Sequence, residues 1–261
     1  MLQHTARKRF GQNFLQDEQI IAAIINEINP RAGQHIVEIG PGQGALTAEL
    51  VASGADVDAI ELDRDLAEFL QQHFISYKNF HLQQADILEF DLRSIFDKKN
   101  KLRVVGNLPY NISSPLLFKL FNDLTIIDEM YFMLQHEVAL RLVATTGNKE
   151  YGRMSVLAQY HCDMQIILDV PPTAFDPRPK VDSNIVYFKP RAKITEVVKD
   201  PKLLKQVATL AFNQRRKTLH NSLKTIINNE KLIKLGIDPQ LRAENISVDQ
   251  YVRIANNISN L

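Results

Sequence analysis

The sequence predicts an α/β fold, in which a parallel sheet is covered by helices on both faces and followed by a small all-helical domain. Two observations support this prediction. Up to residue 190, short apolar segments alternate with segments of helical period, as in the βαβ units of a doubly wound sheet. After residue 190 the strand patterns stop and helix-start signals follow. We therefore expect one domain over residues 1–190 and a second over residues 191–261.

Six segments of the first domain are expected to be strands, because they are short and apolar and alternate with helical patterns. They are residues 35–40, 56–62, 80–86, 102–107, 130–134 and 184–188. Helix-period segments lie between several of them, at residues 45–54, 65–74 and 115–124. An amphipathic helix is expected before the first strand, and Pro30 stops it.

The second domain begins with a clear helix signal. Asp200 is a capping residue, and Pro201 after it is suited to the first helical position. Ser247 and Gln250 have the spacing of a capping box. These signals predict a helical module of about 70 residues, joined through the basic linker 189–193.

The formal net charge of +1 conceals an asymmetry between the two parts of the chain. Residues 189–261 contain 14 Lys and Arg against 6 Asp and Glu, a balance of +8, which leaves −7 for residues 1–188. Such asymmetry suggests that the C-terminal part meets a polyanion. A solvated basic surface on a helical domain explains the charge equally well.

Composition excludes several classes of protein. No run of 18 apolar residues is present, so no membrane span is expected, and the basic start lacks the apolar core of a secretory signal. Cys162 is the only cysteine, which excludes a disulfide framework and a cysteine-based metal cluster and fits a reducing cytoplasm. We expect a monomeric, cytoplasmic protein without a bound metal.

Residues 37–47, "VEIGPGQGALT", form a predicted strand, a glycine-rich turn and the start of a helix. Gly40, Gly42 and Gly44 allow a tight turn and the close approach of a ligand. A glycine triplet alone is weak evidence, because many doubly wound folds need it only to turn. Glu61 strengthens the interpretation, because it ends the second strand, where a carboxylate can accept both hydroxyls of a ribose.

The glycine spacing is not that of a dinucleotide-binding turn. The acidic Glu38 and the proline in the loop make it similar to the first motif of S-adenosylmethionine-dependent methyltransferases, whose sheet is Rossmann-like. At the end of the third strand, Asp86 can accept a hydrogen bond from the adenine amine, and the Ile87 amide can donate to the ring. Asp86 alone would also fit a helix cap. Acceptors on three consecutive strands, Glu38, Glu61 and Asp86, favour a ligand site at the ends of these strands.

The fourth strand ends in Asn107-Leu108-Pro109-Tyr110, at the same edge of the sheet. Adenine N6 is a poor nucleophile, because its lone pair is delocalised into the ring. The Asn107 side-chain oxygen and the Leu108 carbonyl can accept its two amino hydrogens and free that lone pair. Pro109 stiffens the turn, and Tyr110 offers a stacking face for a base taken out of its helix.

The alternative is an ordinary strand-exit turn with a half-buried tyrosine. A neutral Asn107 accepts without attracting a proton, and no strong general base is needed when nitrogen attacks a sulfonium methyl. Catalysis is then expected to come from positioning and water exclusion. In the proline-rich loop 170–183, Phe175 can enclose the target base against Tyr110, although a lone phenylalanine is more often a core residue.

Two basic segments are candidate RNA contacts. At the start, Arg7, Lys8 and Arg9 precede aromatic residues, which suits a nucleic-acid strand, or else the segment is a frayed arm. In residues 212–223, "FNQRRKTLHNSL", the basic side chains are expected on a helix that contacts phosphates. These side chains are Arg215, Arg216 and Lys217.

The motifs "QNFLQD", "VEIGPGQGALT", "GNLPYNISSPLLF", "EYGRMSVLAQY", "PPTAFDPRPKVDS" and "FNQRRKTLHNSL" occur in this order. They closely resemble the bacterial small-subunit ribosomal RNA adenine dimethyltransferases, the kasugamycin-sensitivity methylases, nearly end to end. The resemblance implies transfer of four methyl groups to N6 of two adjacent adenines, in a hairpin near the 3′ end of the 16S RNA. Residues 1–190, with a basic arm at 1–16, would bind S-adenosylmethionine and catalyse the reaction, and residues 191–261 would bind RNA.

The resemblance also assigns site residues. It places the cofactor at Asn13, Leu15, Gly40, Glu61, Asp86 and Asn107, to which we add the adjacent Gly42, Leu62 and Ile87. The catalytic set is Asn107, Leu108, Pro109, Tyr110 and Phe175. The alternatives are a large-subunit RNA methylase of the antibiotic-resistance type, which shares the fold, and an assembly factor that chiefly holds immature small subunits.

Overall fold

The computed structural model describes residues 12–109 and 112–258, which form two compact units. The first unit consists of residues up to 139 together with 165–190, and the second of residues 140–164 together with those from 191 onward. The second unit therefore takes in residues 140–164, which the sequence boundary at residue 190 assigns to the first domain.

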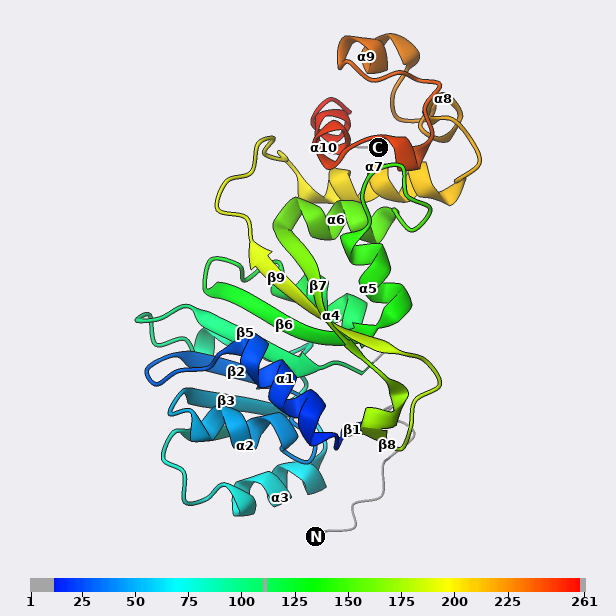
Figure 1. The fold of residues 1–261 in the computed structure, drawn as a ribbon. Coiled ribbons are helices and arrows are strands. Elements are labelled where there is room, and N and C mark those ends of the chain that lie inside the picture. The colour runs from blue at the N-terminus through cyan, green and yellow to red at the C-terminus, as the bar shows by residue number, and fades with distance from the viewer. Residues whose placement is uncertain (1–11, 110–111, 259–261) are drawn as a thin grey trace. The chain divides into compact units, whose positions relative to one another are not determined.

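The first unit contains a seven-stranded sheet with the order β4-β3-β2-β5-β6-β9-β7 (Figure 1). Its strands are β2 (His35–Ile39), β3 (Asp56–Glu61), β4 (Phe80–Gln84), β5 (Leu102–Asn107), β6 (Ile127–Gln135), β7 (Cys162–Val170) and β9 (Ser183–Pro190). Strands β4, β3, β2, β5 and β6 are mutually parallel, and β9 is antiparallel to β6. All six predicted strands are confirmed. Strand β7 was not predicted.

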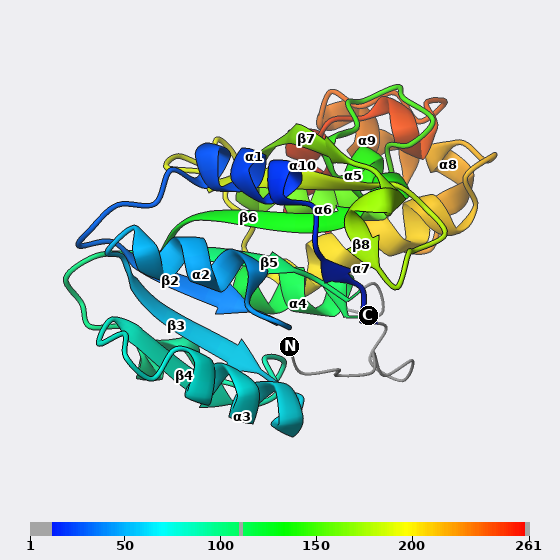
Figure 2. The same cartoon turned by 60° about the horizontal axis from the view of Figure 1, so that its bottom comes forward.

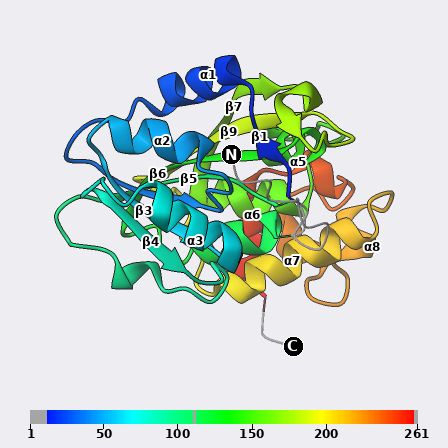
Figure 3. The ribbon, with the colours of Figure 1, turned by 90° about the horizontal axis from the view of Figure 1, so that it is seen from below.

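Helices cover both faces of this sheet, as expected. They are α1 (Glu18–Ile28), α2 (Ala45–Ala52), α3 (Arg64–His73) and α4 (Ser113–Leu120), with the short turns η2 (Leu92–Ser94) and η3 (Pro172–Ala174). Apolar residues of α1, α2 and α3 share one buried cluster with one face of the sheet. Helices α1 and α2 lie side by side on that face (Figures 2 and 3), and α4 lies on the opposite face (Figure 2).

Local sequence sets the ends of α1. The Asp17 side chain accepts hydrogen bonds from the amides of Gln19 (2.9 Å) and Ile20 (3.1 Å), so two amides of the first turn are satisfied. At the other end Asn29 adopts the left-handed conformation with φ of 48°, and Pro30 cannot continue the helix. The predicted stop at Pro30 is confirmed.

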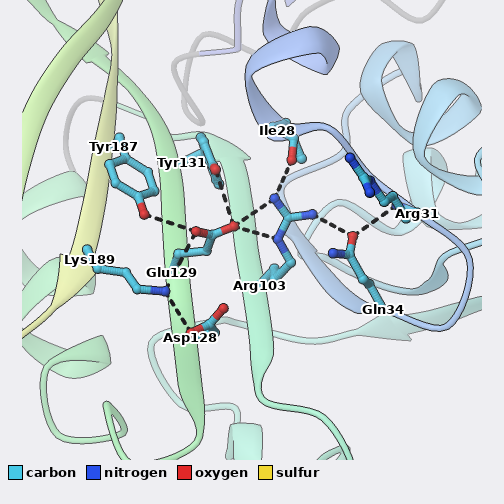
Figure 4. Close-up of polar contacts among 9 residues, drawn as sticks. All are labelled: Ile28, Arg31, Gln34, Arg103, Asp128, Glu129, Tyr131, Tyr187 and Lys189. Carbon is cyan, nitrogen blue, oxygen red and sulfur yellow. Dashed lines mark hydrogen bonds and ion pairs between the residues drawn. The ribbon is translucent and has the colours of Figure 1, made fainter. Parts of the chain in front are cut away.

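A buried polar network holds the end of α1 against the sheet (Figure 4). Arg103 of β5 donates from Nε to Glu129 of β6 at 2.7 Å and from a second nitrogen to Gln34 at 2.7 Å. The same guanidinium donates to the Ile28 carbonyl in the last turn of α1, where a positive charge is favoured. Because the ion pair is largely buried, removing one partner would cost on the order of 3–5 kcal/mol.

The first unit also contains a small two-stranded sheet. The two-residue strand β1 (Phe14–Leu15) pairs antiparallel with β8 (Phe175–Asp176), so Leu15 lies opposite Phe175. This pairing fixes the chain just before α1, and Figure 1 shows β1 and β8 side by side. Two residues are too few for a sequence pattern, and this pairing was not predicted.

The second unit is helical. Its elements are α6 (Arg153–His161), α7 (Pro201–Asn213), α8 (Leu219–Ser222), α9 (Asn229–Lys234), η4 (Ala243–Asn245) and α10 (Val248–Asn256), and α5 (His136–Val143) leads into it from the first unit. The Asp200 cap and the Ser247–Gln250 capping box are confirmed. Phe212 and Tyr251 stack in its core with ring centroids 5.8 Å apart. Among the described residues, no helix has the length and apolarity needed to cross a membrane.

Candidate cofactor and active site

A cavity of about 180 Å³ opens in the first unit at the carboxyl ends of β2, β3 and β5. The last residue of each strand lines it: Ile39, Glu61 and Asn107. The full lining consists of residues 12–15, 38–43, 45–46, 60–63, 66, 85–88, 107–109 and 112. This edge of a parallel sheet is where open α/β folds bind ligands.

The glycine turn forms one wall of the cavity. Gly40, Gly42 and Gly44 all have positive φ, at 64°, 60° and 83°. A side chain at Gly44 would also come within 2.9 Å of the Phe74 ring, whereas at Gly40 the space is open and the conformation alone requires glycine. At Gly40 and Gly42 the turn therefore presents backbone atoms, without a Cβ, to the cavity.

Glu61 lies at the end of β3 with only 6% of its surface exposed. Its carboxylate accepts hydrogen bonds from the amides of Gly42 (3.2 Å) and Asp63 (2.8 Å), so it connects the glycine turn to its own strand. Burial raises its pKa, and the two amide bonds act in the opposite direction. The carboxylate is held rigidly at the cavity, as an acceptor for ribose hydroxyls needs to be.

The turn after β4 forms a second wall. Asp86 accepts a hydrogen bond from the Leu88 amide at 2.8 Å, so it stabilises a local turn; no helix begins there for it to cap, as the alternative interpretation required. Lys119 of α4 donates from Nζ to the Ile87 carbonyl at 2.7 Å and also to the carbonyl of Phe90. Leu62, which is 51% exposed, adds an apolar surface to the lining.

The predicted catalytic motif begins at the third wall. Asn107 donates from Nδ2 to the Asn13 carbonyl at 3.1 Å. This bond identifies which end of the side-chain amide is the nitrogen and which is the oxygen. The Leu108 amide donates to the Met133 carbonyl at 3.3 Å, and its side chain is buried. Residues 107–109 line the cavity, whereas Tyr110 lies outside the described residues.

Phe175 is placed differently from the other predicted site residues. Its ring is 6% exposed and belongs to the buried apolar cluster of the sheet, opposite Leu15. It does not line the cavity. In this conformation Phe175 is a core residue, the alternative stated from the sequence, and its stacking role stays a prediction.

The predicted helix over the basic residues after Phe212 is wrong. Helix α7 ends at Asn213, and Arg215, Arg216 and Lys217 lie exposed on the turn that follows. Beyond this turn Thr218 pairs with Arg242 and directly precedes α8, which begins at Leu219. Arg215 is bound within the unit to the Glu244 carboxylate (3.5 Å) and the Lys149 carbonyl. The N-terminal candidates Arg7, Lys8 and Arg9 lie outside the described residues.

Two acidic residues of the lining were not in the predicted set. Glu38 was recognised as part of the glycine motif, and Asp63 follows Glu61 by two positions. Both are buried. A pattern of acids just before and just after the predicted strand ends is the signal that could have identified them.

The fold and the cavity define a class of protein: the Rossmann-like methyltransferases that use S-adenosylmethionine. The described lining contains four carboxylates and no Lys, Arg or His, which fits a ligand with a sulfonium and an ammonium group. A family model described as ribosomal RNA adenine dimethylase matches residues 3–260. The chain belongs to this family, and S-adenosylmethionine is its cofactor.

Curated relatives and solved structures agree with this assignment. The chain is 50% identical over 261 residues to ribosomal RNA small subunit methyltransferase A of Pseudomonas aeruginosa, covering 100% of this chain and 97% of that protein. It is 51% identical over 254 residues to the protein of that name from Escherichia coli (strain 55989 / EAEC), covering 97% and 93%.

Two solved structures share the fold. A dimethyladenosine transferase from Plasmodium falciparum matches with a TM-score of 0.79 at 24% identity, covering 92% of this chain and 95% of that one. The 23S rRNA methyltransferase ErmE matches with a TM-score of 0.72 at 24% identity, covering 93% and 98%. At this identity the likeness concerns the fold alone.

Proposed function

We propose that the protein dimethylates N6 of two adjacent adenines in the 3′-terminal hairpin of 16S ribosomal RNA, within the small ribosomal subunit, and that this serves small-subunit biogenesis. The relatives at about half identity are named as small-subunit methyltransferases and are matched over nearly their whole length. The observation that carries the chemistry is the position of Asn107, at the end of β5 and in the wall of the cofactor cavity.

The cavity residues would bind the cofactor in a fixed orientation. Glu61 accepts the ribose hydroxyls, Asp86 accepts the adenine amine, and the open backbone at Gly40 admits the amino-acid part. When bound, the cofactor supplies a methyl group on a sulfonium, an electrophile that a nitrogen lone pair can attack.

Asn107 and Leu108 would hold the target base. The Asn107 nitrogen is engaged by the Asn13 carbonyl, so the opposite end of the amide, Oδ1, is the acceptor for one N6 hydrogen. The Leu108 carbonyl accepts the other. These two bonds draw the N6 lone pair out of conjugation, and the surplus proton leaves after the methyl group is transferred. Tyr110, and Phe175 in a more exposed conformation, would stack on the flipped base.

The charge distribution supports an RNA partner. Arg216 and Lys217 are exposed on the turn after α7, in the part of the chain that has a surplus of positive charge. Phosphate contacts of this kind position a protein on RNA without reading sequence. The arm at residues 1–16 would contribute further contacts. We propose that residues 191–261 bind RNA, that the protein acts as a monomer, and that it works in the cytoplasm, where small subunits are assembled.

One assay tests the reaction and its substrate together. Labelled methyl groups from S-adenosylmethionine are followed into unmethylated small subunits and, in parallel, into large subunits, and the RNA is digested to nucleosides. We expect N6,N6-dimethyladenosine from small subunits only. Label in large subunits instead would favour the antibiotic-resistance type of methylase. An Asn107→Ala protein that restores subunit assembly in cells without methylating RNA would favour the assembly-factor alternative.

A further inference from the structure

The cofactor cavity has an unusual balance of charge. Four acidic side chains line it, and its described lining includes no Lys, Arg or His. These acids are Glu38, Glu61, Asp63 and Asp86. S-adenosylmethionine carries one net positive charge, from its sulfonium, ammonium and carboxylate, whereas the product S-adenosylhomocysteine has a neutral sulfur and no net charge. Such a cavity interacts more favourably with the substrate cofactor than with the product.

Together with Asp63, Glu38 is the most deeply buried of the four acidic residues. It is 2% exposed, in β2, and Oε2 accepts a 2.6 Å hydrogen bond from the Thr47 hydroxyl of α2. Burial, the largest effect, raises its pKa to about 7, the charge of Glu61 on β3 adds to this, and the Thr47 hydrogen bond opposes it. Around the cavity, the neighbouring β5 contributes the neutral Asn107. Among the described residues Glu38 has no cationic partner, and the charge of such a buried carboxyl depends strongly on the ligand.

We propose that Glu38 is a proton-linked counter-charge that lets this cavity distinguish cationic S-adenosylmethionine from the neutral-sulfur product. The proposal rests on the assignment of the cavity to the cofactor. Arrival of the cation favours the carboxylate, so Glu38 releases its proton and the ion pair forms in a site of low dielectric constant. After methyl transfer the sulfur is neutral, the carboxyl takes up a proton again, and the product is held less tightly.

The sign of the pH dependence follows from this linkage. In the free protein Glu38 is largely protonated below pH 7, so cofactor binding there must displace a proton and affinity rises with pH. Well above pH 7 the group is already ionised, and affinity levels off. The slope of log affinity against pH approaches about one below the pKa and about zero above it.

Calorimetric titration of the whole protein tests the proposal. S-adenosylmethionine, S-adenosylhomocysteine and sinefungin, which has an amine in place of the sulfonium, are titrated from pH 6 to 8.5 in pairs of buffers with different ionisation enthalpies. The amino-acid ammonium group is common to the three ligands, so differences between them report the charge at the sulfur position. We expect proton release near pH 7 with the two cationic ligands and little with S-adenosylhomocysteine.

Variants identify the group responsible. Glu38→Gln should abolish the difference in proton release and lower the preference for S-adenosylmethionine over S-adenosylhomocysteine on the order of tenfold, the equivalent of one pKa unit. Glu49→Gln, at an exposed position of α2, is the matched control and should behave as the parent. Thr47→Val removes the hydrogen bond that favours the carboxylate, so the pH at which affinity levels off should move upward.

The outcomes separate the two claims. Tight binding of S-adenosylmethionine with no proton release beyond that of S-adenosylhomocysteine would overturn the role of Glu38 and leave the cavity assignment intact. Proton release that persists in Glu38→Gln would also overturn the role of Glu38. If that variant does not fold, an unchanged pH dependence of cofactor affinity in Thr47→Val would overturn the same role. A folded parent protein that binds none of the three ligands would instead refute the cavity assignment.

Discussion

The Asn107 side chain is fastened to the backbone of Asn13, because its Nδ2 donates a 3.1 Å hydrogen bond to the Asn13 carbonyl. The bond joins the end of β5 to the segment just before β1, so residues 94 positions apart in the sequence meet at the cavity. It also identifies the donor end of the amide, and Oδ1 is therefore the acceptor that the proposed chemistry needs.

Asn107→Ala should lower the methyl-transfer rate on the order of a hundredfold or more, because it removes the proposed preorganised contact to the reacting amine. Asn107→Asp retains an acceptor but loses the donor and sets a carboxylate against the Asn13 carbonyl, so it should also be slow. Single-turnover transfer to unmethylated small subunits measures both rates. Subunit binding should survive, because the proposed phosphate contacts lie elsewhere. A folded Asn107→Ala protein with the parental rate would contradict the proposed role.

Glu61→Ala should weaken S-adenosylmethionine binding by roughly 1.5–3 kcal/mol, because it removes the proposed charge-assisted bond to ribose. The change also frees the Gly42 and Asp63 amides, so circular dichroism and thermal unfolding must accompany the calorimetry. Glu61→Gln retains the volume and one acceptor and should reduce affinity less. Equal affinity in the parent and a folded Glu61→Ala protein would remove Glu61 from the ribose site.

Much of the fold is predictable because parallel strands buried on both faces are nearly continuous apolar runs. Strand β2 is buried at all five positions and is evident in the sequence. Strand β7 is harder to identify, because the chain passes directly from α6, which ends at His161, into β7, which begins at Cys162. No Gly or Pro marks the change. The two-residue strand β1 owes its existence to β8, a partner about 160 residues away.

The same distinction, between features set by local sequence and features set by distant partners, applies to the site. Gly40, Glu61 and Asn107 could be placed together from the sequence, because the carboxyl ends of neighbouring parallel strands meet at one edge. Arg215 was placed wrongly on a helix, because nothing local stops α7 and the pairing of Thr218 with Arg242 is a long-range event. Lys119 was missed because the carbonyls that it binds lie about 30 residues earlier in the chain.

Replacing both Arg216 and Lys217 by Gln should weaken binding to small subunits. The slope of log affinity against log salt concentration should become shallower by about one unit for each phosphate that is no longer neutralised. Arg215 is left unchanged, because it is bound to Glu244 within the helical unit. Filter binding over a range of salt concentrations measures the slope, and calorimetry should give an unchanged cofactor affinity. Lys98→Gln with Lys99→Gln, exposed in the first unit, is the control. An unaltered slope would assign Arg216 and Lys217 to an ordinary solvated surface.

Lys119→Met tests how the cavity wall that is proposed to bind adenine is held in place. Lys119 lies in the last turn of α4, and its ammonium donates to two carbonyls of the turn that carries Asp86 and Ile87. Burial lowers its pKa, but nearby carboxylates oppose this shift, and the group remains a strong donor. Met retains most of the apolar stem and removes both bonds, so the turn should loosen while the fold remains.

We expect Lys119→Met to weaken S-adenosylmethionine binding by roughly 1 kcal/mol, about fivefold, because the residues proposed to contact adenine are less well ordered before the ligand arrives. Hydrogen exchange at the amides of residues 86–90 should quicken in the same protein, a change that a general loss of stability would spread over the whole sheet. Lys101→Met, at an exposed position before β5, should leave both measurements unchanged. Parental exchange and affinity in Lys119→Met would mean that Asp86 and Ile87 hold their positions without help from α4.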